Sequence, residues 1–145
     1  MYKCILLPTD GTEFCARALR HGIELAKLVQ AKVVGLTVTL PIHSAVPRSL
    51  IPKNLANVIH SETVKAADEK LLVVQKLATE AGIAVETMRQ SNDHPWQAIV
   101  DAAKAKQCDL IVMASHGRRG ISGFVLGSET QKVLTHSSIP VLVVR

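Results

Sequence analysis

A chain of 145 residues has the length of one domain, so we expect a single domain over residues 1–145. Its content of 48% hydrophobic and 20% charged residues excludes a disordered or fibrous protein, and 3% aromatic residues predict an aliphatic core. The formal net charge of +5 is modest, and the basic residues are scattered without interleaved aromatics, so we expect no nucleic-acid partner.

The cysteines and the start of the chain bear on where the protein works. Cys4, Cys15 and Cys108 match neither a CxxC pair nor a zinc pattern, which favours reduced, mostly buried thiols. The chain enters strand-like sequence at once, without a signal peptide, and no apolar run approaches the roughly 18 residues of a membrane span. We therefore expect a cytoplasmic protein that does not contact a membrane.

The first half of the chain predicts two strands and two helices, with one long loop among them. Thr12 is a candidate N-cap for the first helix, and Gly82 follows the second helix in the C′ position that favours glycine. The segment 41–52 contains three prolines, and a long loop in a compact domain is typical of a functional lid. The predicted strands cover residues 3–8 and 32–38, and the predicted helices cover residues 13–30 and 55–81.

The second half continues the alternation and predicts the fold class. Pro95 begins a third helix as a first-turn proline. The predicted strands cover residues 84–89, 109–114 and 139–144, and the predicted helices cover residues 95–106 and 129–136. This order indicates a single doubly wound α/β domain, whose mainly parallel five-stranded sheet has helices on both faces in a Rossmann-like or flavodoxin-like order. If the first and fourth strands are central neighbours, Asp10, Val38 and the segment 114–128 meet at one crevice.

The glycine-rich segment 113–128, MASHGRRGISGFVLGS, is the most informative part of the sequence. It lies between an apolar strand and the start of a helix, where several backbone N–H groups lack partners. Such amides, together with the helix dipole, favour an anion such as a phosphate. The segment therefore predicts a nucleotide-binding loop.

Other nucleotide-binding folds lack their residues here. No lysine precedes Ser128, so there is no P-loop, and the glycines follow the fourth strand rather than the first, unlike a dinucleotide fingerprint. A phosphate-receiving signalling domain needs an acidic pair after the first strand, an aspartate at the end of the third strand and a lysine at the end of the fifth, and only Asp10 is present. An FMN site needs more aromatics. The sequence also has no HxH, HExxH or Cys/His cluster for a resident metal, and no catalytic triad pattern.

Four segments together resemble the universal stress protein family over the whole chain. They are Ile5-Leu-Leu-Pro-Thr-Asp10, Asp109-Leu-Ile-Val-Met-Ala-Ser-His-Gly117, Gly127-Ser128 and Ile139-Pro-Val-Leu-Val-Val144. The nucleotide-binding branch of that family has glycine, two residues, glycine, nine residues, glycine, and then serine or threonine. Gly117, nine residues and Gly127-Ser128 fit this motif, whereas Ala114 stands in place of the first glycine. The resemblance implies an adenine nucleotide alpha hydrolase-like fold and ATP or AMP as ligand, with Mg²⁺ or Mn²⁺ carried by the nucleotide.

The resemblance also implies which residues surround the nucleotide. Asp10 is expected to accept a hydrogen bond from ribose or base, with capping of the following helix as the alternative. The main chain of Val38 is expected to face the adenine edge, and Gly117 and Gly127 to provide close backbone approach and positive φ. The full set is Pro8, Thr9, Asp10, Val38, Met113, Ala114, Ser115, His116, Gly117, Arg118, Arg119, Gly120, Gly127, Ser128, Glu129 and Thr130.

Residues around the start of the last helix have further expected roles. Ser128 is expected to be both N-cap and phosphate ligand, and Thr130 to add a hydroxyl. Arg118 and Arg119 either reach phosphate oxygens or are solvated. Glu129 lies in the first helical turn, where its charge interacts favourably with the helix dipole and stabilises the protein without a nucleotide. Unless Arg118 or a divalent cation compensates, its charge is expected to weaken the binding of ATP relative to AMP or ADP.

Three functional hypotheses follow. The first is an adenine-nucleotide-binding sensor or regulator of the stress response, without catalytic residues. The second is a weak ATP-hydrolysing or phosphate-transferring enzyme that uses the same loop, and the third is a dimeric interaction module with an empty crevice. Residues Val141 to Val144 form an apolar last strand, and in the family this segment pairs with its copy, so we expect a homodimer built on it.

Overall fold

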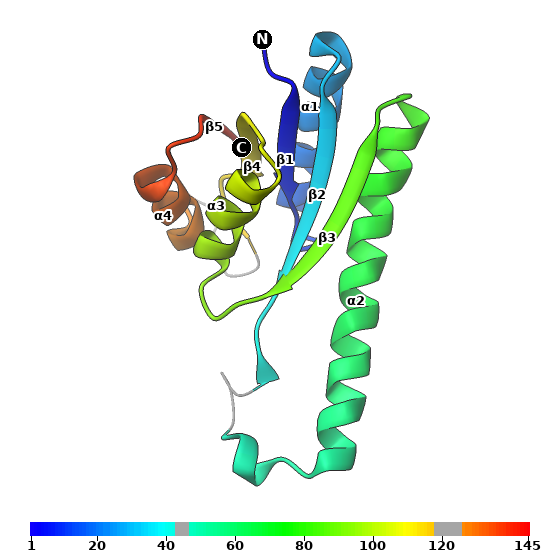
Figure 1. Ribbon diagram of the computed structural model, residues 1–145, viewed down its shortest axis with the longest axis vertical. Coiled ribbons are helices and arrows are strands. Elements are labelled where there is room, and N and C mark those ends of the chain that lie inside the picture. Colours follow the sequence, from blue (N-terminus) through cyan, green and yellow to red (C-terminus); the bar gives the residue numbers. More distant parts are fainter. Residues whose placement is uncertain (43–46, 118–125) are drawn as a thin grey trace.

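The computed structural model describes residues 1–42, 47–117 and 126–145. Five parallel strands form one sheet in the order β3-β2-β1-β4-β5, so β1 and β4 are central neighbours (Figure 1). The predicted doubly wound α/β fold is confirmed. The strands are β1 (Cys4–Pro8), β2 (Lys32–Thr39), β3 (Val85–Ser91), β4 (Leu110–Ala114) and β5 (Val141–Val144). The α-helices are α1 (Glu13–Val29), α2 (Lys53–Glu80), α3 (Pro95–Ala105) and α4 (Ser128–His136), and η2 (Arg48–Leu50) is a 3-10 helix.

Helices bury both faces of the sheet because the central strands carry apolar residues on both sides. On β1, Ile5 and Leu7 belong to the core beneath α1 and α2, whereas Leu6 belongs to the core beneath α3. All three side chains are fully buried. The continuous apolar run of β1 therefore reflects a strand that is covered twice.

Helix α1 begins just after the turn that follows β1 and lies close against that strand. Thr12 is its N-cap, as predicted, and Thr12 Oγ1 accepts a hydrogen bond from the backbone N–H of Cys15 at 3.4 Å. Farther along the helix, Gly22 faces Leu7, and a Cβ at Gly22 would lie 2.3 Å from Leu7 Cδ2. The missing side chain lets the helix approach the strand, which fixes the turn between them at the carboxyl edge of the sheet.

At the amino edge of the sheet, an aspartate joins the starts of the two central strands. Asp109 Oδ2 accepts the backbone N–H of Lys3 at 2.8 Å, and Asp109 Oδ1 accepts that of Cys4 at 3.0 Å. Burial acts to raise the pKa of this carboxyl, but the hydrogen bonds from Cys4 and Lys3 outweigh it and hold the pKa below the ordinary value of 3.8. The charged carboxylate therefore stabilises the pairing of β1 with β4.

We expect Asp109→Asn to lower the free energy of unfolding at neutral pH by about 1–2 kcal/mol, because the variant loses a charged acceptor for two backbone donors. The folded pKa is lowered, so the contribution is complete above the ordinary value of 3.8 and is lost as pH falls through the folded value. Urea unfolding of both proteins over a pH series checks this. A difference that stays constant from neutral to strongly acidic pH would contradict the assignment.

The long helix α2 packs on the sheet through its carboxyl half only. Its buried residues all lie between Ala67 and Ala78, whereas Leu55 and Val58 are 48% and 58% exposed. The amino half extends beyond the ends of the strands (Figure 1). Gly82 follows the helix with a φ of +72°, the left-handed C′ conformation predicted for it.

The strand β2 ends one residue later and the helix α2 begins two residues earlier than predicted, and η2 forms just before α2. Residues 43–46 lie outside the described part of the chain, so the lid role of the segment 41–52 stays a prediction. Across the described ranges, we find no helix whose length and apolar content would let it cross a bilayer.

Candidate functional site

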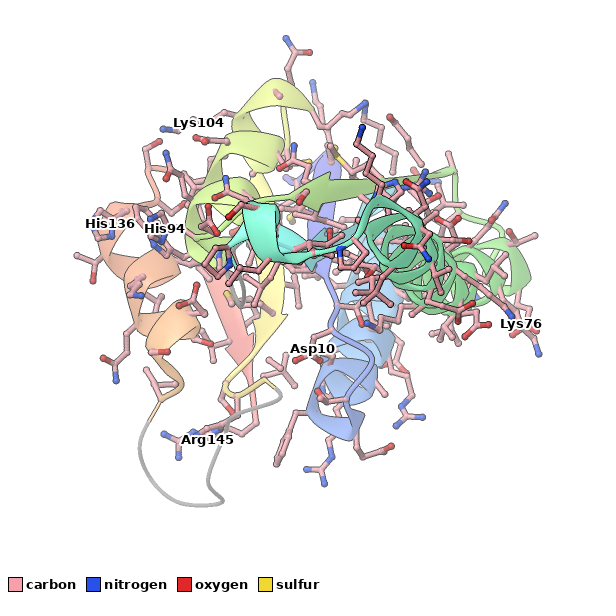
Figure 2. All side chains as sticks on the ribbon, turned by 90° about the horizontal axis from the view of Figure 1, so that it is seen from below. Asp10, Lys76, His94, Lys104, His136 and Arg145 are labelled. Carbon is pink, nitrogen blue, oxygen red and sulfur yellow. The ribbon has the colours of Figure 1, made fainter. Side chains whose placement is uncertain are left out.

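The carboxyl ends of β1, β2 and β4 lie at one edge of the sheet, as the strand order requires. Asp10 lies two residues after the end of β1, and Figure 2 shows it beside the first turn of α1. Asp10 Oδ1 accepts hydrogen bonds from the backbone N–H and the hydroxyl of Thr12, at 2.9 and 2.7 Å. One oxygen of the carboxylate thus organises the start of α1, which was the alternative role for Asp10.

The other carboxylate oxygen of Asp10 faces Gly117, in the loop after β4. A Cβ on Gly117 would lie 2.7 Å from Asp10 Oδ2, and a Cβ on Gly127 would lie 3.2 Å from the carbonyl oxygen of Ser115. Both glycines therefore permit a close approach, as predicted. The predicted positive φ is wrong for both, because the approach needs only the absence of Cβ. Among the described residues, positive φ occurs at Gly11, Gln30, Gly82 and Gln107.

Hydrogen bonds tie the start of α4 to the end of β4. The backbone N–H of Gly127 donates to the Ser115 carbonyl at 2.8 Å, and the Thr130 hydroxyl lies 3.0 Å from the carbonyl oxygen of Ala114. Thr130 is 3% exposed. The Thr130 hydroxyl therefore donates its proton to the end of β4 rather than to a ligand.

Gly127, rather than Ser128, is the N-cap of α4. The first hydrogen bond of the helix runs from the Gln131 N–H to the Gly127 carbonyl at 3.0 Å, so Ser128 already belongs to the first turn. The prediction that Ser128 caps the helix is wrong by one residue. The capping position lies against the Ser115 carbonyl, where a Cβ would be only 3.2 Å from the oxygen, so the tight fit favours glycine there.

This cap leaves the amides that an anion site requires. The backbone N–H groups of Ser128, Glu129 and Thr130 precede the first intrahelical hydrogen bond and have no acceptor within the helix. The Ser128 side chain is exposed. Three amides and one hydroxyl thus lie at the positive end of the helix dipole, which is the arrangement that binds phosphate.

Val38 presents its backbone at the end of the neighbouring strand. The Leu36 carbonyl accepts the Thr9 N–H on the β1 side at 2.8 Å, and the Thr39 carbonyl accepts the Asn92 N–H on the β3 side at 3.0 Å. Because backbone groups of successive strand residues face alternate edges, the N–H and C=O of Val38 face the β1 side. There they lie beyond the end of the β1–β2 ladder, which stops at Pro8 and Leu36.

Most of the other predicted site residues form the framework of the crevice. The Ser115 hydroxyl lies 3.0 Å from His116 Nδ1, and the His116 ring lies 5.8 Å from the ring of Phe14. Four further predicted residues have side chains that are buried in the sheet or in the turn after β1. They are Pro8, Thr9, Met113 and Ala114. The predicted site residues outside the described part of the chain are Arg118, Arg119 and Gly120.

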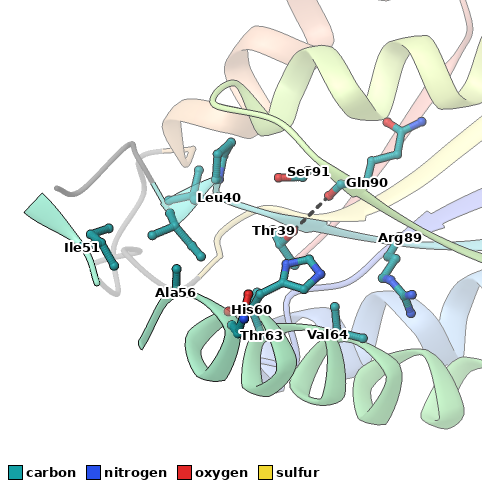
Figure 3. Close-up of a pocket in the computed structure, with 13 residues that line it drawn as sticks. Thr39, Leu40, Ile51, Ala56, His60, Thr63, Val64, Arg89, Gln90 and Ser91 are labelled. Atoms are coloured by element: carbon teal, nitrogen blue, oxygen red, sulfur yellow. Dashed lines mark hydrogen bonds between the residues drawn. The ribbon is translucent and has the colours of Figure 1, made fainter. Parts of the chain in front are cut away.

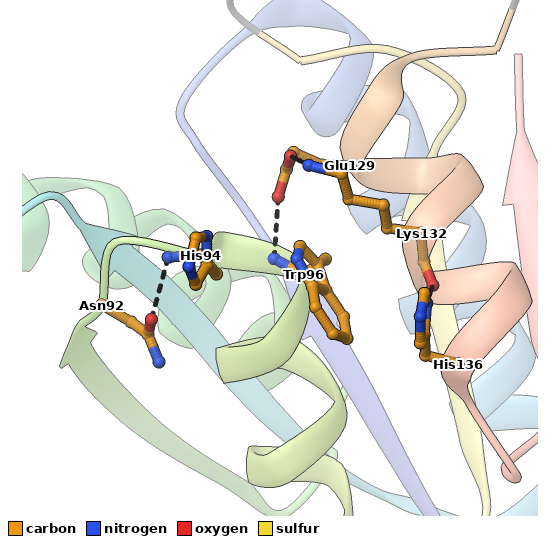
Figure 4. A network of polar contacts seen from close by, with 6 residues as sticks. All are labelled: Asn92, His94, Trp96, Glu129, Lys132 and His136. Atoms are coloured by element: carbon orange, nitrogen blue, oxygen red, sulfur yellow. Dashed lines mark hydrogen bonds and ion pairs between the residues drawn. The ribbon is translucent and has the colours of Figure 1, made fainter.

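Glu129 makes a contact that sequence reasoning missed. Its Oε2 accepts the backbone N–H of Trp96 in the first turn of α3 at 2.9 Å, and its Oε1 lies 3.1 Å from Lys132 Nζ (Figure 4). The Trp96 indole lies against the His136 imidazole, with centroids 4.4 Å apart. The carboxylate thus satisfies an amide of another helix and joins α4 to α3. The partners are 33 residues apart in sequence, so no local pattern signals the contact.

A separate cavity of about 450 Å³ lies at the carboxyl ends of β2 and β3, beside the amino half of α2 (Figure 3). His60 and Arg89 line it together with apolar residues such as Leu40. The Arg89 guanidinium is paired with Asp68. The cavity lies on the β3 side of β2, whereas the Val38 backbone faces the β1 side, so it is distinct from the crevice.

Comparison with known proteins places the whole chain in one group. A model of the universal stress protein family matches residues 1–145. Universal stress protein MJ0531 of Methanocaldococcus jannaschii is 34% identical over an alignment of 146 positions, which covers 100% of this chain and 83% of that protein. The solved structure of MJ0577 from the same organism has a TM-score of 0.84 at 31% identity, and 99% of this chain and 96% of that chain are covered.

Two solved structures of universal stress proteins contain adenine nucleotides. One, in complex with cAMP, has a TM-score of 0.72 at 24% identity and covers 99% of this chain and 97% of that chain. The other, from Archaeoglobus fulgidus in complex with dAMP, has a TM-score of 0.72 at 20% identity and covers 99% and 98%. Both share the fold of this chain.

Proposed function

The chain belongs to the universal stress protein family, and on that premise we propose that it binds an adenine nucleotide, ATP or AMP, between the ends of β1, β2 and β4. In this proposal the protein is a cytoplasmic sensor or regulator of the stress response. The cAMP and dAMP complexes support it, because each holds an adenine nucleotide on the same fold.

Backbone amides at the start of α4 give this proposal its main support. The N–H groups of Ser128, Glu129 and Thr130 lack intrahelical acceptors, so we assign the phosphates to them. We assign a ribose hydroxyl to Asp10 and the adenine edge to the backbone of Val38. In this assignment the backbone N–H groups donate to phosphate oxygens, and the Asp10 carboxylate accepts a hydrogen bond from a ribose hydroxyl. Each polar group of the protein therefore has a complementary group on the nucleotide.

Calorimetric titration of the chain with AMP and ATP, after removal of any co-purified nucleotide, tests the proposal. We expect one site per chain and a Tm that rises with ligand concentration. A Tm unchanged by every adenine nucleotide would contradict the proposal and favour a dimeric module with an empty crevice. Phosphate release that needs Mg²⁺ or Mn²⁺, and that is lost in Ser128→Ala, would favour a weak ATP-hydrolysing enzyme instead.

We expect Glu129→Gln to raise the affinity for ATP relative to AMP by about threefold, because the carboxylate repels each added phosphate but is partly exposed and paired with Lys132. Mg²⁺ or Mn²⁺ bound to the triphosphate should reduce the effect. Dissociation constants for AMP, ADP and ATP, measured with and without the cation, check this. Lys132→Gln should lower the affinity for ATP relative to AMP, because it leaves the Glu129 carboxylate without its cationic partner. Equal ATP-to-AMP affinity ratios in the wild type and both variants would contradict the repulsion hypothesis.

We also propose that β5 pairs with its copy in a homodimer. This strand is at the edge of the sheet, and Leu142 in its middle is 42% exposed. Light scattering at micromolar concentration should show a dimer that Leu142→Arg converts to monomer. Leu134→Arg is a matched control, because Leu134 is equally exposed but lies on α4. A wild-type chain that is only monomeric under these conditions would rule the dimer out.

A further inference from the structure

The amino edge of the sheet, opposite the nucleotide crevice, holds two cysteines in contact. Cys4 begins β1 and Cys108 lies just before β4, and their Sγ atoms are 3.1 Å apart. Their side chains are buried in the same core cluster, beneath α3, whereas Cys15 belongs to the cluster on the other face of the sheet. The contact joins positions 104 residues apart, so no cysteine spacing in the sequence indicates it.

We propose that Cys4 and Cys108 are a redox modification site, which a hydroperoxide oxidises to a disulfide that links the starts of β1 and β4. A disulfide has an S–S distance of about 2.05 Å, so the two sulfurs need to approach by only about 1 Å. The backbone around them is already fixed, because Asp109 holds the N–H groups of Lys3 and Cys4. The site therefore needs side-chain adjustment rather than movement of a strand.

The chemistry balances with a hydroperoxide as the two-electron oxidant. The thiolate of Cys108, at 5% the more exposed of the pair, attacks the O–O bond and becomes a sulfenic acid, and the other peroxide oxygen leaves as water or an alcohol. The Cys4 sulfur then attacks the sulfenic sulfur, which forms the S–S bond and releases water. One thiol proton ends in the water or alcohol that leaves from the peroxide, and the other ends in the water released from the sulfenic acid. Each sulfur is oxidised by one electron, and the O–O bond takes up the two electrons.

Position, rather than acidity, sets this pair apart. Burial raises the pKa of the Cys108 thiol, so its thiolate is scarce and the first step is slow. Burial also raises the pKa of Cys15, to about 11. A sulfenic acid at Cys108 has a second thiol in contact to resolve it, whereas Cys15 lies in the other core. Disulfide formation is therefore expected at one pair only.

The disulfide should stabilise the fold without altering the crevice. It would close a loop between positions 104 residues apart, which restricts the unfolded chain, so we expect a rise in Tm of about 10 °C. The crevice lies at the other ends of the same strands. We therefore expect the dissociation constant for AMP to change by less than about twofold.

The test exposes the full chain to hydrogen peroxide and counts thiols by intact mass after unfolding and alkylation with iodoacetamide. The three free cysteines of the wild type should fall to one, the remaining Cys15, and dithiothreitol should restore all three. Cys15→Ala should form the same cross-link and show the same Tm rise. Cys4→Ala should form no cross-link and show no rise in Tm. In that variant the sulfenic acid of Cys108 should be trapped by dimedone.

Oxidation of Met1, which is 95% exposed, is the control that shows that the peroxide has reacted with the protein. Three alkylated thiols in the wild type after Met1 is oxidised would overturn the proposal. So would a disulfide that includes Cys15 or one that joins two chains. Thiol count and Tm are measured without nucleotide, so failure here is distinguishable from failure of nucleotide binding.

Discussion

Gly127→Val is expected to weaken adenine-nucleotide binding roughly 100-fold, about 2.7 kcal/mol, while the sheet stays folded. A Cβ at this position would already lie 3.2 Å from the Ser115 carbonyl oxygen, and valine adds two methyl groups to it. The start of α4 must then move away from β4, and the Gly127 N–H loses its bond to Ser115. The three amides that we assign to phosphate move with it.

Titration with AMP measures this loss, and circular dichroism checks that the helices remain. Ser128→Ala is the matched control, because it removes a hydroxyl but leaves the amides of α4 in place. We expect a loss of about tenfold or less for that variant. A Gly127→Val protein that binds AMP like the wild type would show that the phosphates lie elsewhere.

A second large effect, on the stability of the fold, is expected at Gly22 in α1. Helix propensity alone predicts that Gly22→Ala stabilises the chain by about 1 kcal/mol. Packing predicts the opposite sign, because the new Cβ would lie 2.3 Å from Leu7 Cδ2 in a fully buried layer. Overpacking of this kind costs about 1–3 kcal/mol, so we expect a net loss of free energy of unfolding.

A double-mutant cycle with Leu7 isolates the cause. Leu7→Ala alone should cost about 2–5 kcal/mol, because it leaves a cavity beneath α1. In that background Gly22→Ala should become neutral or stabilising, since the methyl group that it meets is gone. If Gly22→Ala destabilises both backgrounds equally, the close contact between α1 and β1 is not the reason for the glycine.

The fold was predictable from sequence because its signals are local. Thr12 and Gly82 mark helix ends by chemistry that acts within a few residues, and both predictions are confirmed. The doubly buried run of β1 likewise predicts a central strand. Given that topology, the meeting of Asp10 with the loop of Gly117 follows from strand order.

The details that sequence reasoning missed all depend on contacts between distant segments. Gly127 replaces Ser128 as N-cap because the Ser115 carbonyl lies against it, and the Thr130 hydroxyl points back to the end of β4. Glu129 contacts an amide of α3 rather than acting only on its own helix. Such partners are set by the packing of whole elements, which residue spacing does not encode.

The contact between α3 and α4 gives the chain an optical reporter of its own (Figure 4). Trp96 is its one tryptophan, with its indole against His136 and its amide bound to Glu129, and both partners belong to α4. Indole emission responds to the polarity around the ring and to quenching by a neighbouring histidine side chain. Any shift of α4 when an anion arrives at its first turn is therefore observable as a change in fluorescence, without an added dye.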